Sequence, residues 1–158
     1  MSRIEDDLTE NELELFEKYF SKVKLSKQYR HEFSNWLPEI SYRNNTTISE
    51  ILNSENLKTI INSEKMNGPQ KLSHIRDELY KMRFPELTKI QNEWESLTRK
   101  VNPDRKKIKF IADRYFEKAE IELSIKANST EEILEKLKQL SNIKPENWNK
   151  IIDPFRED

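Results

Sequence analysis

The residue pattern changes period twice between Lys106 and Ser141, which constrains the fold more than any other feature of the sequence. A strand-like run at 107–113 and a connector at 114–118 precede residues 119–127, where apolar and polar side chains alternate. Alternation with a period of two is typical of a strand with one buried face. An isolated hairpin is only marginally stable in water. We therefore expect another element to complete this hairpin, and a second copy of the chain is one candidate.

Polar residues before apolar helical stripes mark where helices begin. Thr9 with Glu12, and Thr47 with Glu50, have the spacing of capping boxes, and Ser26 is suited to cap the helix between them. Ser129 with Glu132 has the same spacing and predicts a helix after the hairpin.

Proline and glycine mark where helices are expected to break. Pro38 should disrupt or end the second helix, because proline lacks the donor that a helix interior needs. Asn67-Gly68-Pro69 suggests a helix end with glycine in the left-handed conformation. A change of apolar phase near Asn53-Ser54, the pair Phe84-Pro85 and the turn at 102–104 are further breaks.

These patterns predict an α+β protein. Residues 1–84 form a helical module of roughly five helices, 85–144 form a helix, hairpin and helix that dimerises, and 145–158 form a tail with a short helix. The sheet is expected to become continuous across the dimer.

Composition excludes several classes of site. The chain has no cysteine, so disulfides and thiolate metal sites are impossible. Gly68 is its single glycine, whereas nucleotide-binding loops and nucleophile elbows need several. No apolar run approaches the length of a membrane span, and the acidic start is unlike a signal peptide, so we expect a cytoplasmic protein that does not bind membranes.

Charge is concentrated locally, although the formal net charge is only -1. Residues 99–109 hold one acid, Asp104, and a group of bases: Arg99, Lys100, Arg105, Lys106, Lys107 and Lys109. Lys107 and Lys109 are expected on one face of the first strand. Such a face can follow a DNA backbone without sequence preference, although a charged edge that prevents strand aggregation would look the same.

The helix at 87–101, the basic strand, the strand Glu120-Ile-Glu-Leu-Ser-Ile and the phrase Asn128-Ser-Thr-Glu-Glu-Ile-Leu-Glu-Lys-Leu137 together resemble a known domain. It is the C-terminal dimerisation domain of ParB-type partition proteins. The resemblance implies that two subunits share one sheet and that Lys107 and Lys109 face DNA. It further implies a dimer core built from these residues: Ile121, Leu123, Ile133, Leu134 and Leu137.

The arginine-rich nucleotide-binding motif and the helix-turn-helix of the partition proteins are missing from the sequence. The resemblance therefore implies neither nucleotide hydrolysis nor recognition of a specific centromere sequence.

Catalytic chemistry has little support in the sequence. His31 and His74 lie on different predicted helices and belong to no metal-binding motif, and we predict no catalytic residue, metal or cofactor. A metal-dependent nuclease using Asp104, or Glu120 and Glu122 on the second strand, remains an alternative.

The leading hypothesis is a non-enzymatic, DNA-associated homodimer. An adaptor that binds a protein partner through residues 26–40 is the main alternative, because three aromatic side chains share one stripe there: Tyr29, Phe33 and Trp36.

Overall fold

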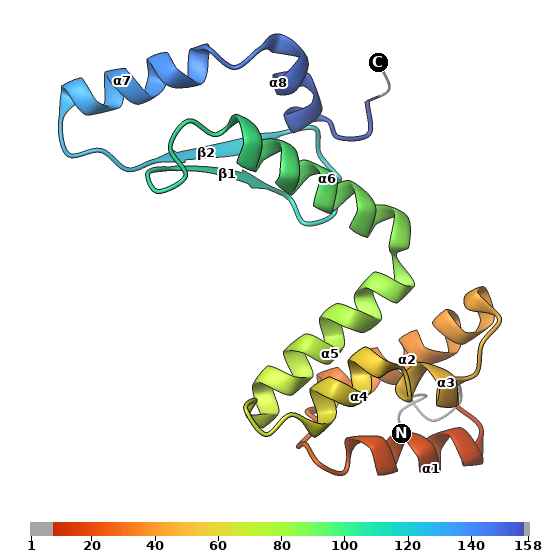
Figure 1. Ribbon diagram of the computed structural model, residues 1–158. Helices are drawn as coiled ribbons and strands as arrows, with labels where there is room; N and C mark the ends of the chain where they lie inside the picture. Colours follow the sequence, from red (N-terminus) through yellow and green to blue (C-terminus); the bar gives the residue numbers. More distant parts are fainter. Residues whose placement is uncertain (1–7, 157–158) are drawn as a thin grey trace. The chain divides into compact units, whose positions relative to one another are not determined.

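A computed structural model describes residues 8–156, which divide after Pro85 into an N-terminal and a C-terminal compact unit. The predicted mainly helical α+β class is confirmed, because these residues form helices and one antiparallel hairpin. The helices of the N-terminal unit are α1 (Glu10–Phe20), α2 (Lys27–Asn44), α3 (Ile48–Leu52), α4 (Glu55–Asn62) and α5 (Gly68–Arg83) (Figure 1). The C-terminal unit contains α6 (Pro85–Val101), β1 (Ile108–Ala112), β2 (Ile121–Ile125), α7 (Thr130–Ser141) and α8 (Pro145–Ile152).

The helix starts follow the capping signals. Thr9 with Glu12, and Thr47 with Glu50, form reciprocal capping boxes, and the Ser26 hydroxyl accepts from the Tyr29 amide. The expected break near Asn53-Ser54 separates α3 from α4.

The predicted break at Pro38 is wrong, whereas the break at Asn67-Gly68-Pro69 is present but the glycine has a different role in it. Helix α2 continues through Pro38 to Asn44, and Asn45 ends it in the left-handed conformation. Leu37 and Ile40 are both fully buried beside the proline, and their packing outweighs the lost backbone hydrogen bond. Gly68 does not end a helix: it begins α5, with Asn67 as the N-cap.

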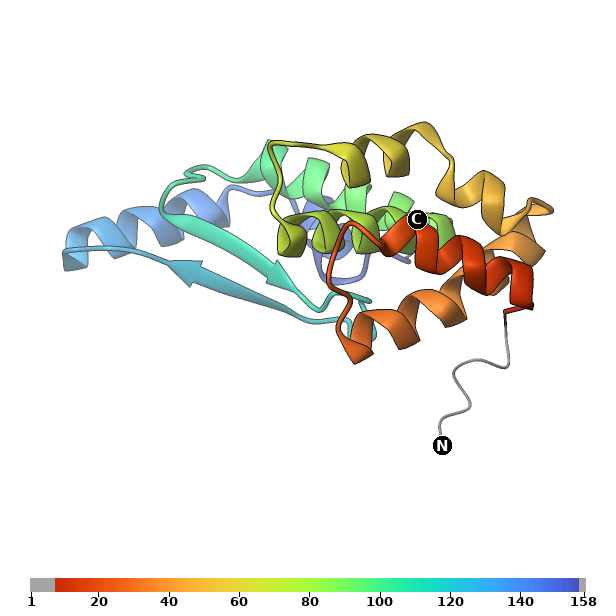
Figure 2. The ribbon, with the colours of Figure 1, turned by 90° about the horizontal axis from the view of Figure 1, so that it is seen from below.

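Aromatic and aliphatic side chains from all five helices build the core of the N-terminal unit. The rings of Phe20 and Phe33 stack with centroids 5.4 Å apart, and this contact joins α1 to α2. Helix α5 packs on α2 and α4 through the fully buried Ile75 and Leu79. Figure 2 shows the loop that turns the chain from α1 into α2.

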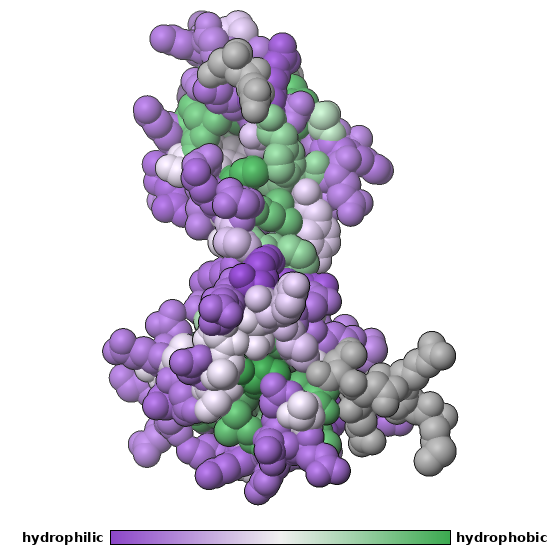
Figure 3. Space-filling model, turned by 90° about the vertical axis from the view of Figure 1, so that its right-hand side faces the viewer, coloured by the Kyte–Doolittle hydropathy of each residue, from purple (hydrophilic) through white to green (hydrophobic). Residues whose placement is uncertain are grey.

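The C-terminal unit has a small core. Ile108, Leu140 and Ile143 are buried, and Val101, Phe110, Ile125 and Trp148 pack around them. In the antiparallel register Ile108 lies opposite Ile125 and Phe110 opposite Leu123. The space-filling view shows apolar side chains between the polar ones on this unit (Figure 3).

The segment after residue 144 carries the short helix expected of it, but it is not a free tail. Ile151 of α8 is fully buried, and its carbonyl accepts a hydrogen bond of 2.9 Å from the Trp94 indole. Helix α8 therefore packs onto α6.

Leu37→Ala should lower the free energy of unfolding by about 2–5 kcal/mol, because it leaves a cavity in a fully buried site. Tyr42→Ala, in the same helix but at a 92% exposed position, should change it by less than about 0.5 kcal/mol. Urea unfolding followed by circular dichroism measures both. Equal effects would contradict the packing of α2.

Candidate nucleic-acid interface

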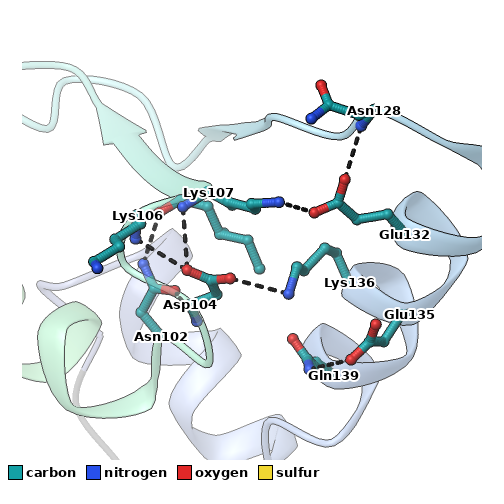
Figure 4. A network of polar contacts seen from close by, with 10 residues as sticks. Asn102, Asp104, Lys106, Lys107, Asn128, Glu132, Glu135, Lys136 and Gln139 are labelled. Carbon is teal, nitrogen blue, oxygen red and sulfur yellow. Dashed lines mark hydrogen bonds and ion pairs between the residues drawn. The ribbon is translucent and has the colours of Figure 1, made fainter.

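The loop between α6 and β1 is held by short polar side chains. The Asn102 side chain accepts from the Asp104 amide at 3.0 Å and donates to the Ile108 carbonyl at 2.9 Å. Asp104 Oδ1 accepts from the amides of Lys106 (3.1 Å) and Lys107 (3.2 Å) (Figure 4). Asparagine and aspartate stabilise turns in this way. The loop therefore presents its basic residues from an ordered backbone.

Two ion pairs join this loop to α7: the loop supplies the acid in one pair and the base in the other. Asp104 Oδ2 lies 3.0 Å from the Lys136 ammonium, and the Lys107 ammonium contacts Glu132 Oε1 (Figure 4). Lys136 is only 8% exposed, so its charge depends on the aspartate for compensation.

The predicted capping box at the start of α7 is half correct. The Ser129 hydroxyl accepts from the Glu132 amide at 3.1 Å, as expected. Glu132 does not return to the Ser129 amide; its Oε2 accepts from Asn128 at 2.8 Å, while Oε1 binds Lys107.

The hydrogen bond from Lys136 lowers the pKa of Asp104 below the ordinary value of an aspartate. Burial opposes this shift, whereas the amides of Lys106 and Lys107 reinforce it. Asp104 is therefore an anion at neutral pH, and Lys136 compensates its charge.

The predicted basic residues differ in whether their charge is paired with a carboxylate. The Lys107 ammonium is taken up by Glu132, so Lys107 and Lys109 do not form one free cationic face. The others are exposed, and within residues 8–156 none is ion-paired with a carboxylate: Arg99, Lys100, Arg105, Lys106 and Lys109. We call these five residues the basic patch.

A groove of about 350 Å³ lies between α6 and β1. Three members of the basic patch line it, Arg99, Arg105 and Lys109, together with one acid, Glu95. The remaining lining residues are Trp94, Thr98, Asn102, Ile108, Phe110 and Ile111. The groove thus combines apolar walls with a positive charge balance.

The predicted dimer residues are largely uncovered. Ile121 is half-buried, and the rest are exposed: Leu123 (38%), Ile133 (40%), Leu134 (59%) and Leu137 (50%). Helix α7 instead turns Glu132, Lys136 and Leu140 toward its own unit. Its apolar stripe of Ile133, Leu134 and Leu137 therefore faces away from the unit's core.

The aromatic stripe considered for a protein partner lies mostly inside the N-terminal unit. Phe33 is fully buried, Trp36 is 7% exposed and Tyr29 is half-buried. The guanidinium groups of Arg76 and Arg83 both lie over the Trp36 ring, 5.4 and 5.2 Å from its centroid. These side chains offer little surface to a partner.

The residues considered for catalysis are dispersed. His31 and His74 are exposed, and Glu120 lies 3.6 Å from Lys118. Among residues 8–156 there is no group of three histidine, aspartate or glutamate side chains placed to hold a metal ion. The same part of the chain contains no helix both long and apolar enough to cross a membrane.

Comparison with protein-family models, curated proteins and solved structures found no match to this chain.

The sequence did not predict the role of Lys136, and it assigned Glu132 only to the helix cap and Asn102 only to a turn, whereas all three organise the loop. The signal for the first two was their spacing of four residues, which places an acid and a base on one helix face. The prediction for this helix rested on its apolar stripe, which lies on a different face of the helix from Glu132 and Lys136.

Asp104→Asn should lower the midpoint of urea unfolding of the C-terminal unit at pH 7, because Lys136 then lacks its counter-charge. Since the folded-state pKa of Asp104 is lowered, the wild-type advantage is full above the ordinary aspartate pKa of about 3.9. It should be lost as the pH falls through the folded value. Tryptophan fluorescence at pH 7 and in acid measures the difference.

Glu135→Gln removes an exposed carboxylate of α7 that accepts from Gln139 and takes no part in the two ion pairs with the loop, and it serves as the control. A difference between Asp104→Asn and wild type that stays constant down to acid pH would contradict an ionic role for Asp104.

Proposed function

We propose that this chain is a non-enzymatic, DNA-associated protein that works as a homodimer and binds the phosphate backbone through the basic patch. The observation that carries the proposal is that the acid of the loop and Lys107 are both ion-paired, whereas the other cations nearby are not. The loop's own acid, Asp104, is neutralised by Lys136, and Lys107 by Glu132. The five remaining cations face solvent from one short stretch of chain.

Phosphate binding fits this arrangement better than base reading does. Arginine and lysine neutralise phosphates and release counterions, which gives affinity without sequence preference. The ordered loop holds Arg105 and Lys106 side by side, so less conformational entropy is lost on binding.

The homodimer follows from the uncovered apolar side chains. Ile133, Leu134 and Leu137 form a stripe on α7, and Leu123 is open on β2. A contiguous apolar surface of this kind marks an interaction site. Two copies would also place two basic patches on one duplex, and so raise the affinity through a higher effective concentration.

Flanking charges on α7 favour a second copy as the partner. Glu131 and Lys138, both exposed, lie on the same side of the apolar stripe, seven residues apart. In an antiparallel pairing, each Glu131 would face the Lys138 of the other copy. Such self-complementarity is what a two-fold interface requires. The resemblance of residues 87–141 to the dimerisation domain of ParB-type proteins leads to the same expectation.

Replacing Arg105, Lys106 and Lys109 together by glutamate should abolish binding to a random duplex of about thirty base pairs, since each phosphate contact contributes about −0.9 to the slope of log K against log salt concentration. Fluorescence anisotropy at several salt concentrations measures the effect.

The matched control replaces Lys89, Lys118 and Lys144 by glutamate, which changes the net charge equally at exposed sites outside the basic patch. Equal loss of binding in both triple variants would mean that overall charge, and not the patch, holds the DNA. No binding by the wild type at low salt would overturn the proposal itself.

Leu134→Glu should convert the dimer to a monomer. A buried leucine contributes about 1.5–3 kcal/mol and occurs twice in a two-fold interface, so the dissociation constant should rise at least about a hundredfold. Ile152→Glu, at a 40% exposed apolar site on α8, should leave the dimer intact. Sedimentation analysis distinguishes the two, and a dimer that survives Leu134→Glu would contradict an interface on α7.

A further inference from the structure

The hydrogen bonding of the hairpin shows which backbone groups lie at the outer edge of β1. The Lys126 amide donates to the Lys107 carbonyl at 2.8 Å, which fixes the phase of the antiparallel ladder. Lys109 therefore makes both of its backbone hydrogen bonds to Ser124, and Ile111 makes both of its backbone hydrogen bonds to Glu122. The amides and carbonyls between them, those of Ile108, Phe110 and Ala112, point outward.

The loop after α6 supplies hydrogen-bond partners for the outward backbone groups of Ile108. The Ile108 amide donates to the Asp104 carbonyl at 2.8 Å, and its carbonyl accepts from Asn102. Phe110 and Ala112 follow along the same edge, and within residues 8–156 their outward groups have no hydrogen-bond partner.

The α6–β1 groove runs along this edge. Four consecutive residues of β1, 108–111, line it, although their side chains alternate between the two faces of the sheet. A cavity that contacts successive strand residues follows the edge and not one face. Its other wall is formed by Trp94 and Thr98, four residues apart on one side of α6, and by Asn102 just after the helix.

The backbone groups and charged side chains that line the groove indicate which kind of ligand it can bind. Unpaired amides and carbonyls at a strand edge are completed by another extended peptide backbone. Arg99, Arg105 and Lys109 outnumber the single acid Glu95, so the added strand should be acidic. Trp94 and Ile108 supply apolar walls for the side chains between those acids.

We propose that the groove binds an extended acidic segment of a partner protein, which adds to β1 as a third strand. Main-chain hydrogen bonds to Phe110, which lines the groove, and to Ala112, the next outward residue beyond its end, provide affinity. The three cations select acidic side chains at alternate positions. A nucleic-acid strand would supply negative charge but no ladder of amides and carbonyls.

The site shares Arg99, Arg105 and Lys109 with the basic patch, and in this respect alone the inference rests on the proposed function. A peptide in the groove would occupy three of the five cations that DNA needs. Peptide and duplex should therefore compete, so that an acidic partner would release the protein from DNA.

The test uses a fluorescein-labelled octapeptide of alternating glutamate and valine, titrated with the full chain and followed by anisotropy. Ala112→Pro removes an outward amide without removing a β1–β2 hydrogen bond, and should weaken peptide binding about tenfold or more. Ala112→Ser keeps this amide at the same position and is the matched control. It should leave the affinity unchanged.

A second measurement does not depend on how the variants fold. The same peptide with alternate backbone amides N-methylated keeps its charge but cannot form the ladder, and it should fail to bind the wild-type chain. Equal binding of the methylated peptide, or equal weakening of peptide binding in Ala112→Pro and Ala112→Ser, would overturn the proposal.

Titration with a labelled duplex separates this inference from the proposed function. If the duplex binds and the peptide does not, the peptide site is wrong and the DNA proposal stands. If the peptide binds and the duplex does not, the DNA proposal fails and the peptide site remains. Binding of both without competition would contradict the shared cations.

Discussion

The ion pair between Asp104 and Lys136 is the contact on which the C-terminal unit depends. Lys136 is 8% exposed, and a cation so placed must be paired or it destabilises the fold. The same carboxylate accepts from two loop amides, so one side chain both compensates the lysine and shapes the loop. The positions of Arg105 and Lys106 follow from that arrangement.

This use of charge gives α7 an unusual orientation. A helix on a small domain normally buries its apolar stripe, but α7 turns its ion pairs inward and leaves Ile133, Leu134 and Leu137 open. The core of Ile108, Leu140 and Ile143 is correspondingly small. A unit built in this way gains most from a partner that covers the stripe.

The sequence predicts the elements well and their contacts poorly. Period and capping residues such as Thr9 and Thr47 act locally, so the helix starts and the hairpin could be inferred. Pro38 could not be placed correctly, because the burial of its neighbours is a tertiary effect. The pairing of Lys107 with Glu132 joins residues 25 positions apart, and no local pattern reveals it. The basic residues at 99–109 were therefore predicted as a group, but the pairing of Lys107 with Glu132 was not.

The alternating polarity of the two ion pairs has a consequence for the register of α7. Along the helix, Glu132 meets Lys107 and Lys136 meets Asp104. Sliding α7 by one turn, about 5.4 Å, would bring Lys136 beside Lys107 in one direction and Glu132 beside Asp104 in the other. Both displacements juxtapose like charges. The two ion pairs are therefore compatible with only one position of α7 along its axis relative to the loop.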